Sequence, residues 1–203
     1  MKQRILTGVL AIGLWFAAQP VLAASLGLTT DTPRIVASDA LVEFSDLGFG
    51  FGDLSSFGAV VDSTEGIALT DPAEISFGFG FDSFDPTDLP AGGFSIFDDF
   101  GFNEVLSGDL VALGFMTDTI ELLMNVTGGS AVGSFGPQVL LTISFNGLGA
   151  DPFAAFVDDG QTFAASLTVE NVVDSNVIPL PAGLPLLLTA LGGLVVVRRR
   201  RVA

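Results

Sequence analysis

An alternation of apolar residues with small or polar ones, at a period of two, recurs along this 203-residue chain. In residues 74–81, Ile75, Phe77, Phe79 and Phe81 fall on one face of an extended chain, while serine and glycine fall on the other. Because the side chains of a strand point alternately to its two faces, this pattern predicts a half-buried β-strand. Six further windows share the pattern, the last three more weakly: 119–126, 141–145, 163–169, 34–44, 58–62 and 110–116.

Turn-forming residues separate these windows, as at Asp71-Pro72, Thr127-Gly128-Gly129 and Asp151-Pro152. Strong helical periodicity is absent between the two ends of the chain, although residues 151–157 could form one short turn. Seven or eight short strands joined by turns predict an all-β fold. The expected architecture is a single β-sandwich with jelly-roll or Greek-key connections.

The region 44–102 is unusual because it holds 12 phenylalanines among many glycines and aspartates. One interpretation is that the rings fill the core, while glycine on the opposite face lets another layer approach closely. The alternative is a sticky, strand-pairing segment of a matrix protein. The interspersed aspartates favour the first interpretation, and the second stays open.

The N-terminus has the organisation of a secretory signal peptide, although an uncleaved anchor is an alternative. Lys2 and Arg4 precede an apolar stretch at 5–18. Val21 and Ala23 suit the shallow pockets of the signal peptidase, so cleavage is expected after Ala23, with cleavage after Ala24 close behind. Residues 1–23 are therefore assigned to the signal peptide.

The C-terminus carries a second targeting segment. Residues 178–197 contain no charge, and four arginines follow them, Arg198, Arg199, Arg200 and Arg201. Prolines shorten the helix that this run could form, but arginine side chains can reach a headgroup layer and hold the cytoplasmic side of a membrane. The sequence therefore predicts a C-terminal transmembrane helix rather than a buried core helix.

The residues Ile178, Pro179, Leu180, Pro181 and Ala182, followed by an apolar run, a glycine pair and the arginine cluster, resemble the VPLPA-CTERM sorting domain, a relative of the PEP-CTERM signals. Only this tail is covered, and isoleucine stands where the motif has valine. The resemblance implies recognition by a membrane-embedded exosortase that processes the protein and passes its body to the cell surface or extracellular matrix. These five residues would then be a recognition motif and not an active site.

The chain accordingly divides into a signal peptide (1–23), an acidic β-sandwich ectodomain (24–177) and a sorting signal with a membrane segment (178–203). The ectodomain has a single basic residue, Arg34, against all 23 acidic residues, a net charge of −22. Such a surface repels phosphate backbones, so a nucleic-acid partner is excluded.

The residue types that are missing restrict catalysis. The chain has no histidine, cysteine or tyrosine, and Lys2 is its only lysine. A serine or threonine nucleophile would lack a base, and the usual zinc or copper ligands are absent. A hydrolase that uses two carboxylates is conceivable, but no acidic pair is marked out by an aromatic or basic setting. We therefore expect no enzymatic activity.

No cofactor is required by the sequence, although calcium is a candidate ligand. The acidic residues proposed for it cluster beside turns at Asp82, Asp85, Asp88, Asp98 and Asp99. Calcium prefers six to eight oxygen ligands, which such turns can supply, but the spacing matches no EF-hand loop. Solvated loop aspartates are the simpler interpretation.

Together these features predict an exported, non-enzymatic protein of the cell surface or extracellular matrix, which crosses the inner membrane in transit. Its expected partners are signal peptidase, an exosortase-type enzyme and the membrane, through the C-terminal helix. The alternative is a calcium-assisted carbohydrate-binding or adhesion module, for which an extracellular polysaccharide is the candidate partner.

Overall fold

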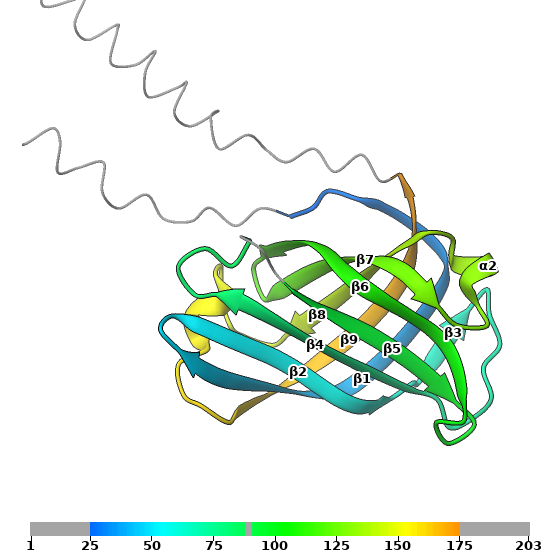
Figure 1. Cartoon of the computed structure of the whole chain (residues 1–203), viewed down its shortest axis with the longest axis horizontal. Coiled ribbons are helices and arrows are strands. Elements are labelled where there is room, and N and C mark those ends of the chain that lie inside the picture. Colours follow the sequence, from blue (N-terminus) through cyan, green and yellow to red (C-terminus); the bar gives the residue numbers. More distant parts are fainter. Residues whose placement is uncertain (1–24, 88–90, 175–203) are drawn as a thin grey trace, which may run out of the picture.

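The structure is a computed structural model of the chain, and it describes residues 25–87 and 91–174. Most of this part is antiparallel β-structure (Figure 1). The strands are β1 (Thr29–Gly48), β2 (Phe51–Val60), β3 (Ser63–Glu65), β4 (Glu74–Asp82), β5 (Ala91–Asp98), β6 (Asn103–Met116), β7 (Thr119–Gly128), β8 (Gln138–Phe145) and β9 (Gln161–Asp174). Two short helices lie between strands, α2 (Val132–Phe135) and η2 (Pro152–Ala155).

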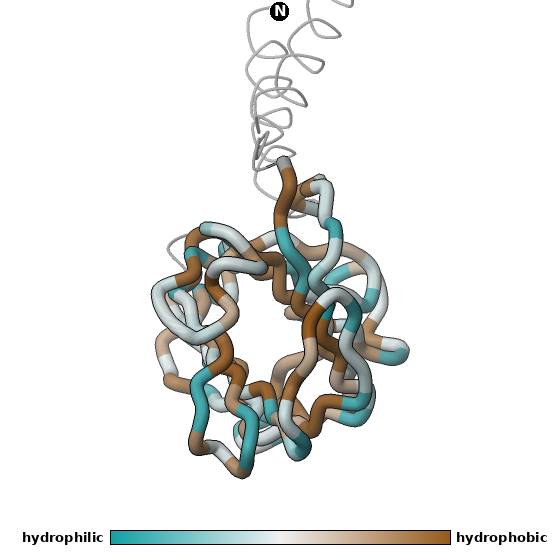
Figure 2. Tube along the Cα trace, turned by 90° about the vertical axis from the view of Figure 1, so that its right-hand side faces the viewer, coloured by the Kyte–Doolittle hydropathy of each residue, from teal (hydrophilic) through white to brown (hydrophobic). Residues whose placement is uncertain are grey.

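Eight of these strands close into a barrel. Their order is β1-β2-β4-β5-β6-β7-β8-β9, and β9 pairs with β1 to complete the ring (Figure 2). All the pairings are antiparallel, and β3 adds to the edge of β1 at residues 34–36, which β2 does not reach. The observed fold is thus a closed eight-stranded antiparallel barrel.

The predicted all-β class is confirmed, but the predicted sandwich is wrong. A period of two is the same in both architectures, so the sequence pattern could not separate them. What closes the ring is β1, a strand of 20 residues that pairs with β9 along one edge and with β2 along the other. Bulges between Asp31 and Arg34 and between Ala37 and Ala40 interrupt its pairing with β9, and such irregularities bend and twist a strand as closure requires.

The second part of the predicted architecture is a C-terminal transmembrane helix. Within 25–87 and 91–174, no helix is long and apolar enough to cross a membrane. The segment 178–203, to which that prediction referred, lies outside the described residues, as does the signal peptide at 1–23.

The interior of the barrel is filled by side chains, as expected for eight strands. Inward residues such as Ile75, Leu122 and Val169 have no exposed surface. Each end is also plugged: Phe135 of α2 is fully buried at the end where β7 meets β8. At the opposite end, η2 and the residue after it insert Phe153 and Phe156 among the core phenylalanines.

Most of the predicted strand windows are confirmed. The short turn expected at 151–157 is confirmed as well, since η2 forms there. The strands β3 and β5 were missed, because β3 has three residues and β5 opens with Gly92-Gly93 instead of an alternating pattern. The 12 phenylalanines of 44–102 divide between the two interpretations. Five are buried, at 44, 77, 79, 81 and 94, six are exposed, at 49, 51, 57, 84, 100 and 102, and Phe97 is partly buried.

Candidate functional site

A groove of about 350 Å³ lies on the outer face of β4, β5 and β6. Its floor is formed by Gly78 and Gly93, which pair across β4 and β5. Its sides carry the hydroxyl groups of Ser76, Ser95 and Ser107, which also follow one another across the three strands. We call this region the outer-wall groove.

The alternation in β4 explains why the wall is hollow here. Phe77 and Phe79 point into the core, so the alternate residues Ser76, Gly78 and Gly80 face outward, and these are small. The strand β5 must also approach β4 closely at Gly92, where a Cβ atom would lie 2.3 Å from the carbonyl oxygen of Gly78. Small residues on both strands therefore leave the backbone accessible.

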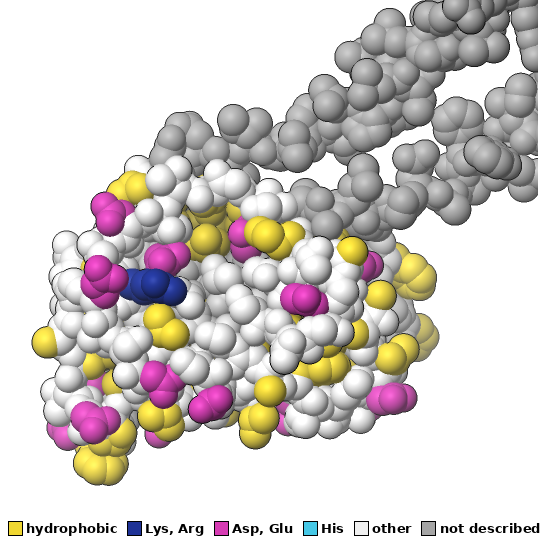
Figure 3. Space-filling model, turned by 180° about the vertical axis from the view of Figure 1, so that it is seen from behind, with side chains coloured by type: hydrophobic (Ala, Val, Ile, Leu, Met, Phe, Trp, Pro, Cys, Tyr) yellow, Lys and Arg dark blue, Asp and Glu magenta, His cyan; other side chains and the backbone are white. Residues whose placement is uncertain are grey.

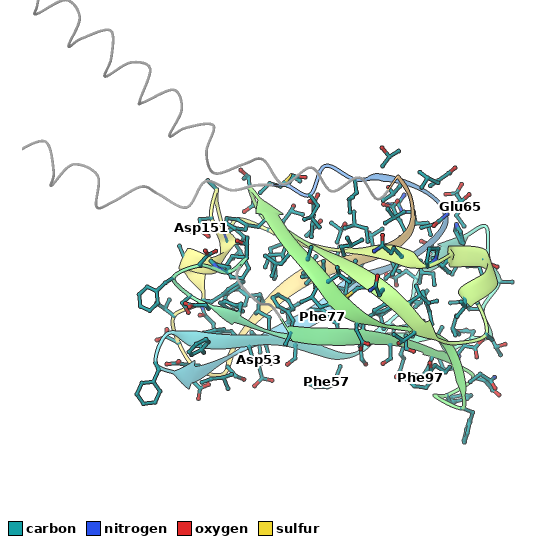
Figure 4. All side chains as sticks on the ribbon, turned by 45° about the horizontal axis from the view of Figure 1, so that its top comes forward. Asp53, Phe57, Glu65, Phe77, Phe97 and Asp151 are labelled. Atoms are coloured by element: carbon teal, nitrogen blue, oxygen red, sulfur yellow. The ribbon has the colours of Figure 1, made fainter. Side chains whose placement is uncertain are left out.

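Phe57 stands beside the groove with 82% of its surface exposed (Figure 4). It follows Ser56 at the start of a bulge between β2 and β4, and Gly58 adopts a φ of +66° at this bulge. The amide of Gly58 donates a hydrogen bond to Ser76 Oγ at 2.9 Å. The bulge is thereby tied to the groove wall, and it presents an aromatic face next to the hydroxyl groups.

Asp109 and Thr127 complete the side of the groove opposite Phe57. Asp109 is exposed and pairs with Gly93 on one side and with Asn125 on the other. The groove thus combines hydroxyl groups, one carboxylate and one ring, and Ser107 Oγ donates a hydrogen bond to Glu104 Oε1 at 2.6 Å. This set can stack on and hydrogen-bond to a neutral, hydroxyl-rich ligand.

The electrostatic environment disfavours anionic ligands. Among the described residues Arg34 is the only lysine or arginine, and its Nε lies 3.4 Å from Glu170 Oε1. Figure 3 shows this lone basic group between acidic ones on the far side of the molecule. On β2, burial raises the pKa of Asp53, which lies between Ser45 and Gly80 on the neighbouring strands.

A second exposed feature is an apolar tip at the end of the barrel where β1 turns into β2. Phe49 is fully exposed there, and Leu47, Phe51 and Phe84 are more than half exposed. The ring of Phe84 lies over Gly50, where an added Cβ would be 2.4 Å from Phe84 Cε2. The hairpin and the β4–β5 connection therefore share one apolar surface.

The proposed calcium ligands are not brought together. Asp82 and Asp85 lie at the end with the apolar tip, whereas Asp98 and Asp99 lie at the other end of β5, and Asp88 is outside the described residues. Asp82 accepts a hydrogen bond from the Phe84 amide at 2.8 Å, and Asp85 accepts one from Thr87 Oγ1 at 2.8 Å. Within 25–87 and 91–174, no group of three or more acidic residues is placed to hold a metal ion.

The sorting-motif residues 178–182 and the arginines 198–201 lie outside the described part of the chain, so their predicted roles stay predictions. The outer-wall groove was missed by sequence analysis. Its signal lies in the serine and glycine face of 74–81, a pattern that by itself also fits a packing surface.

Comparisons of the chain with protein-family models, with curated proteins and with solved structures find no match.

Proposed function

We propose that this is an exported, non-enzymatic protein of the cell surface or extracellular matrix, delivered by an N-terminal signal peptide and a C-terminal sorting signal. The observation that supports it is the fit between the barrel and the predicted processing points. The closed ring runs from Thr29 to Asp174, between the two predicted processing points, and its main core cluster within the described residues runs from Ile35 to Val169.

The placement of the C-terminal junction also suits a displayed protein. Asp174, the last residue of β9, pairs with Thr29, the first residue of β1, so the sorting signal follows the barrel at the end where β1 begins. The apolar tip lies at the opposite end of the strands, and the outer-wall groove lies along the side. A protein held through its C-terminal side could therefore present both features to its surroundings.

The test is processing of the tail in the producing cell. Mass spectrometry of the C-terminus is expected to show removal of the arginine cluster in the wild type. Replacing Pro179 and Pro181 by alanine should give an unprocessed, membrane-retained precursor, because it removes both prolines of the recognition motif. Pro185→Ala, outside the motif, is the matched control and should be processed normally. Normal processing of the double variant would contradict the proposal.

The outer-wall groove favours one more specific role, the binding of a neutral polysaccharide. An exposed ring beside aligned hydroxyl groups is suited to a sugar chain, since the ring can stack on the sugar and the hydroxyls can bond to it. The acidic surface disfavours polyanionic chains. This role depends on the groove alone and requires no calcium.

Affinity electrophoresis in gels that contain neutral polysaccharides tests this role. Phe57→Ala is expected to abolish retardation of the protein. Phe102→Ala is the matched control, since Phe102 is 83% exposed but lies in the β5–β6 turn, away from the groove. Retardation should persist with a chelator. Equal retardation of the wild type and Phe57→Ala would show that the outer-wall groove does not bind the polysaccharide.

A further inference from the structure

Glu121 is a buried carboxylate on the outer face of β7. Only 8% of its surface is exposed. Its strand neighbours in register are Gly114 on β6 and Thr142 on β8, which carry no charge. The only lysine or arginine of the described residues, Arg34, pairs with Glu170. Glu121 therefore lacks a cationic side chain as a partner within 25–87 and 91–174, although a buried carboxylate is costly without one.

The chain segment 25–28 covers this carboxylate. Ser25 Oγ lies 3.1 and 2.9 Å from the two carboxylate oxygens of Glu121, and the Leu26 amide donates to Oε2 at 2.7 Å. The same segment covers an apolar patch beside Glu121. Leu26 and Leu28 pack against a small cluster on the outer wall, formed by Leu123, Leu140 and Val172.

The segment also directly follows the predicted cleavage site. Signal peptidase is expected to cut after Ala23 or after Ala24, so the new chain would begin with Ala24 or Ser25. Cleavage creates an α-amino group, which is protonated at neutral pH. In one serine the α-nitrogen and Oγ are roughly 3 Å apart, so an ammonium on Ser25 would lie within about 6 Å of Glu121.

We propose that Glu121 is the binding site for the α-ammonium group of the processed chain, so that removal of the signal peptide completes the outer wall of the barrel. The inference rests on the proposed export through a cleavable signal. Within 25–87 and 91–174, the uncleaved chain offers Glu121 only neutral amide and hydroxyl donors. After cleavage, it also offers the positive charge that the buried carboxylate lacks, at a distance of roughly 6 Å, where opposite charges attract each other.

The sequence allows this to be tested cleanly. After cleavage the chain contains no lysine, so amine reagents modify the α-amino group alone. The chain from Ser25 to Ala203 is made with an N-terminal fusion tag, held in detergent, and melted before and after a protease removes the tag at Ser25. A parallel preparation begins at Ala24.

Release of the tag is expected to raise Tm by roughly 2–4 °C, and acetylation of the new amine should reverse this. Reductive methylation, which keeps the charge, should not. Glu121→Gln should abolish the rise, whereas Glu43→Gln, at an exposed position on β1, should leave it intact. The contrast between acetylation and methylation is measured on the wild type, so it does not depend on how stable the Glu121→Gln variant is.

No rise on tag release, or an equal loss of Tm on acetylation and on methylation, would overturn the proposal. An equal rise in Glu121→Gln would do so as well. The proposed export is judged separately, by N-terminal sequencing of the protein from the producing cell. A start far from residues 24 and 25 would count against the signal peptide, while the tag experiment would still report on Glu121.

Discussion

Phe153 meets Phe81 edge to face inside one end of the barrel, with the ring centroids 4.7 Å apart. Phe153 comes from η2, in the long β8–β9 connection, and its ring centroid also lies 5.3 Å from that of Phe115. Edge-to-face pairs of this kind add to the free energy that burial supplies. One residue of a connecting segment thus joins rings from β4 and β6 and plugs the barrel.

Phe153→Ala is expected to lower the free energy of unfolding by about 3–5 kcal/mol, because it removes a ring that is 93% buried and leaves a cavity. Urea denaturation measures the change. Phe49→Ala removes an equally large ring that is fully exposed, and it should change stability by no more than about 0.5 kcal/mol. If the two variants lost the same stability, the ring of Phe153 would not be a plug.

The fold shows what a local pattern can and cannot predict. The predicted windows within β4, β7 and β9 could be found because alternation is visible within each strand. Closure is not a local property. It depends on pairs such as Ile35 with Val169 and Phe44 with Leu54, which join distant parts of the chain. Nothing in either partner's own sequence specifies that β1 pairs on both edges.

The floor of the outer-wall groove gives a second prediction. A Cβ atom added at Gly78 would meet only Ser55 Cβ, at 3.7 Å, which is ordinary contact. Gly78→Ala should therefore retain or slightly raise Tm, since alanine is favoured over glycine within a strand, and it should weaken polysaccharide binding by filling the floor. Affinity electrophoresis and thermal melting measure the two effects.

Gly92→Ala, on the adjacent strand, is the informative contrast. There the new Cβ would lie 2.5 Å from Phe79 Cβ, so the backbone must move and Tm should fall. Unchanged polysaccharide binding in Gly78→Ala would show that the floor of the groove makes no contact with the ligand, even if the protein does bind a polysaccharide.

The groove also shows why the site escaped prediction from sequence. The small outward face of 74–81 was visible, but a groove forms only because that face lies beside Gly93 and Ser107. This juxtaposition depends on β5, whose glycine pair conceals its strand pattern. Phe57 was equally hidden, because the bulge that turns it outward is set by pairing with β4.

Asp98 provides a third prediction, about the long connection between β2 and β4. Its Oδ2 accepts a hydrogen bond from the Thr70 amide at 2.9 Å, and the Asp99 amide donates to the Thr70 carbonyl at 3.3 Å. Asp98 is 8% exposed, so its loss would leave a donor unsatisfied in a partly buried place. Asp98→Ala should cost about 1–3 kcal/mol and speed amide exchange in residues 61–73.

Asp98→Asn is the matched variant, because its side-chain carbonyl can still accept from Thr70. It should keep exchange in 61–73 close to that of the wild type. Hydrogen exchange followed by mass spectrometry resolves this segment from the barrel strands. Equal protection of 61–73 in the wild type and Asp98→Ala would show that the connection is held by other contacts.

Asp53 gives the last prediction, a dependence of stability on pH. Burial raises the pKa of Asp53 above its usual value, so the folded barrel binds this proton more tightly than the unfolded chain does. Stability from this residue is therefore fully present below the unfolded pKa, near 3.9, and is lost as the pH rises through the folded pKa. At pH 7 the charged, half-buried carboxylate is a net cost. Asp53→Asn should then raise Tm at pH 7 and change it little at pH 3. Asp39→Asn, at an exposed position on β1, removes the same charge from a very acidic molecule, so its effect at pH 7 measures the general relief of repulsion. The gain in Asp53→Asn should exceed this control at pH 7 and match it at pH 3, and a gain no larger than the control's at pH 7 would rule out burial as its cause.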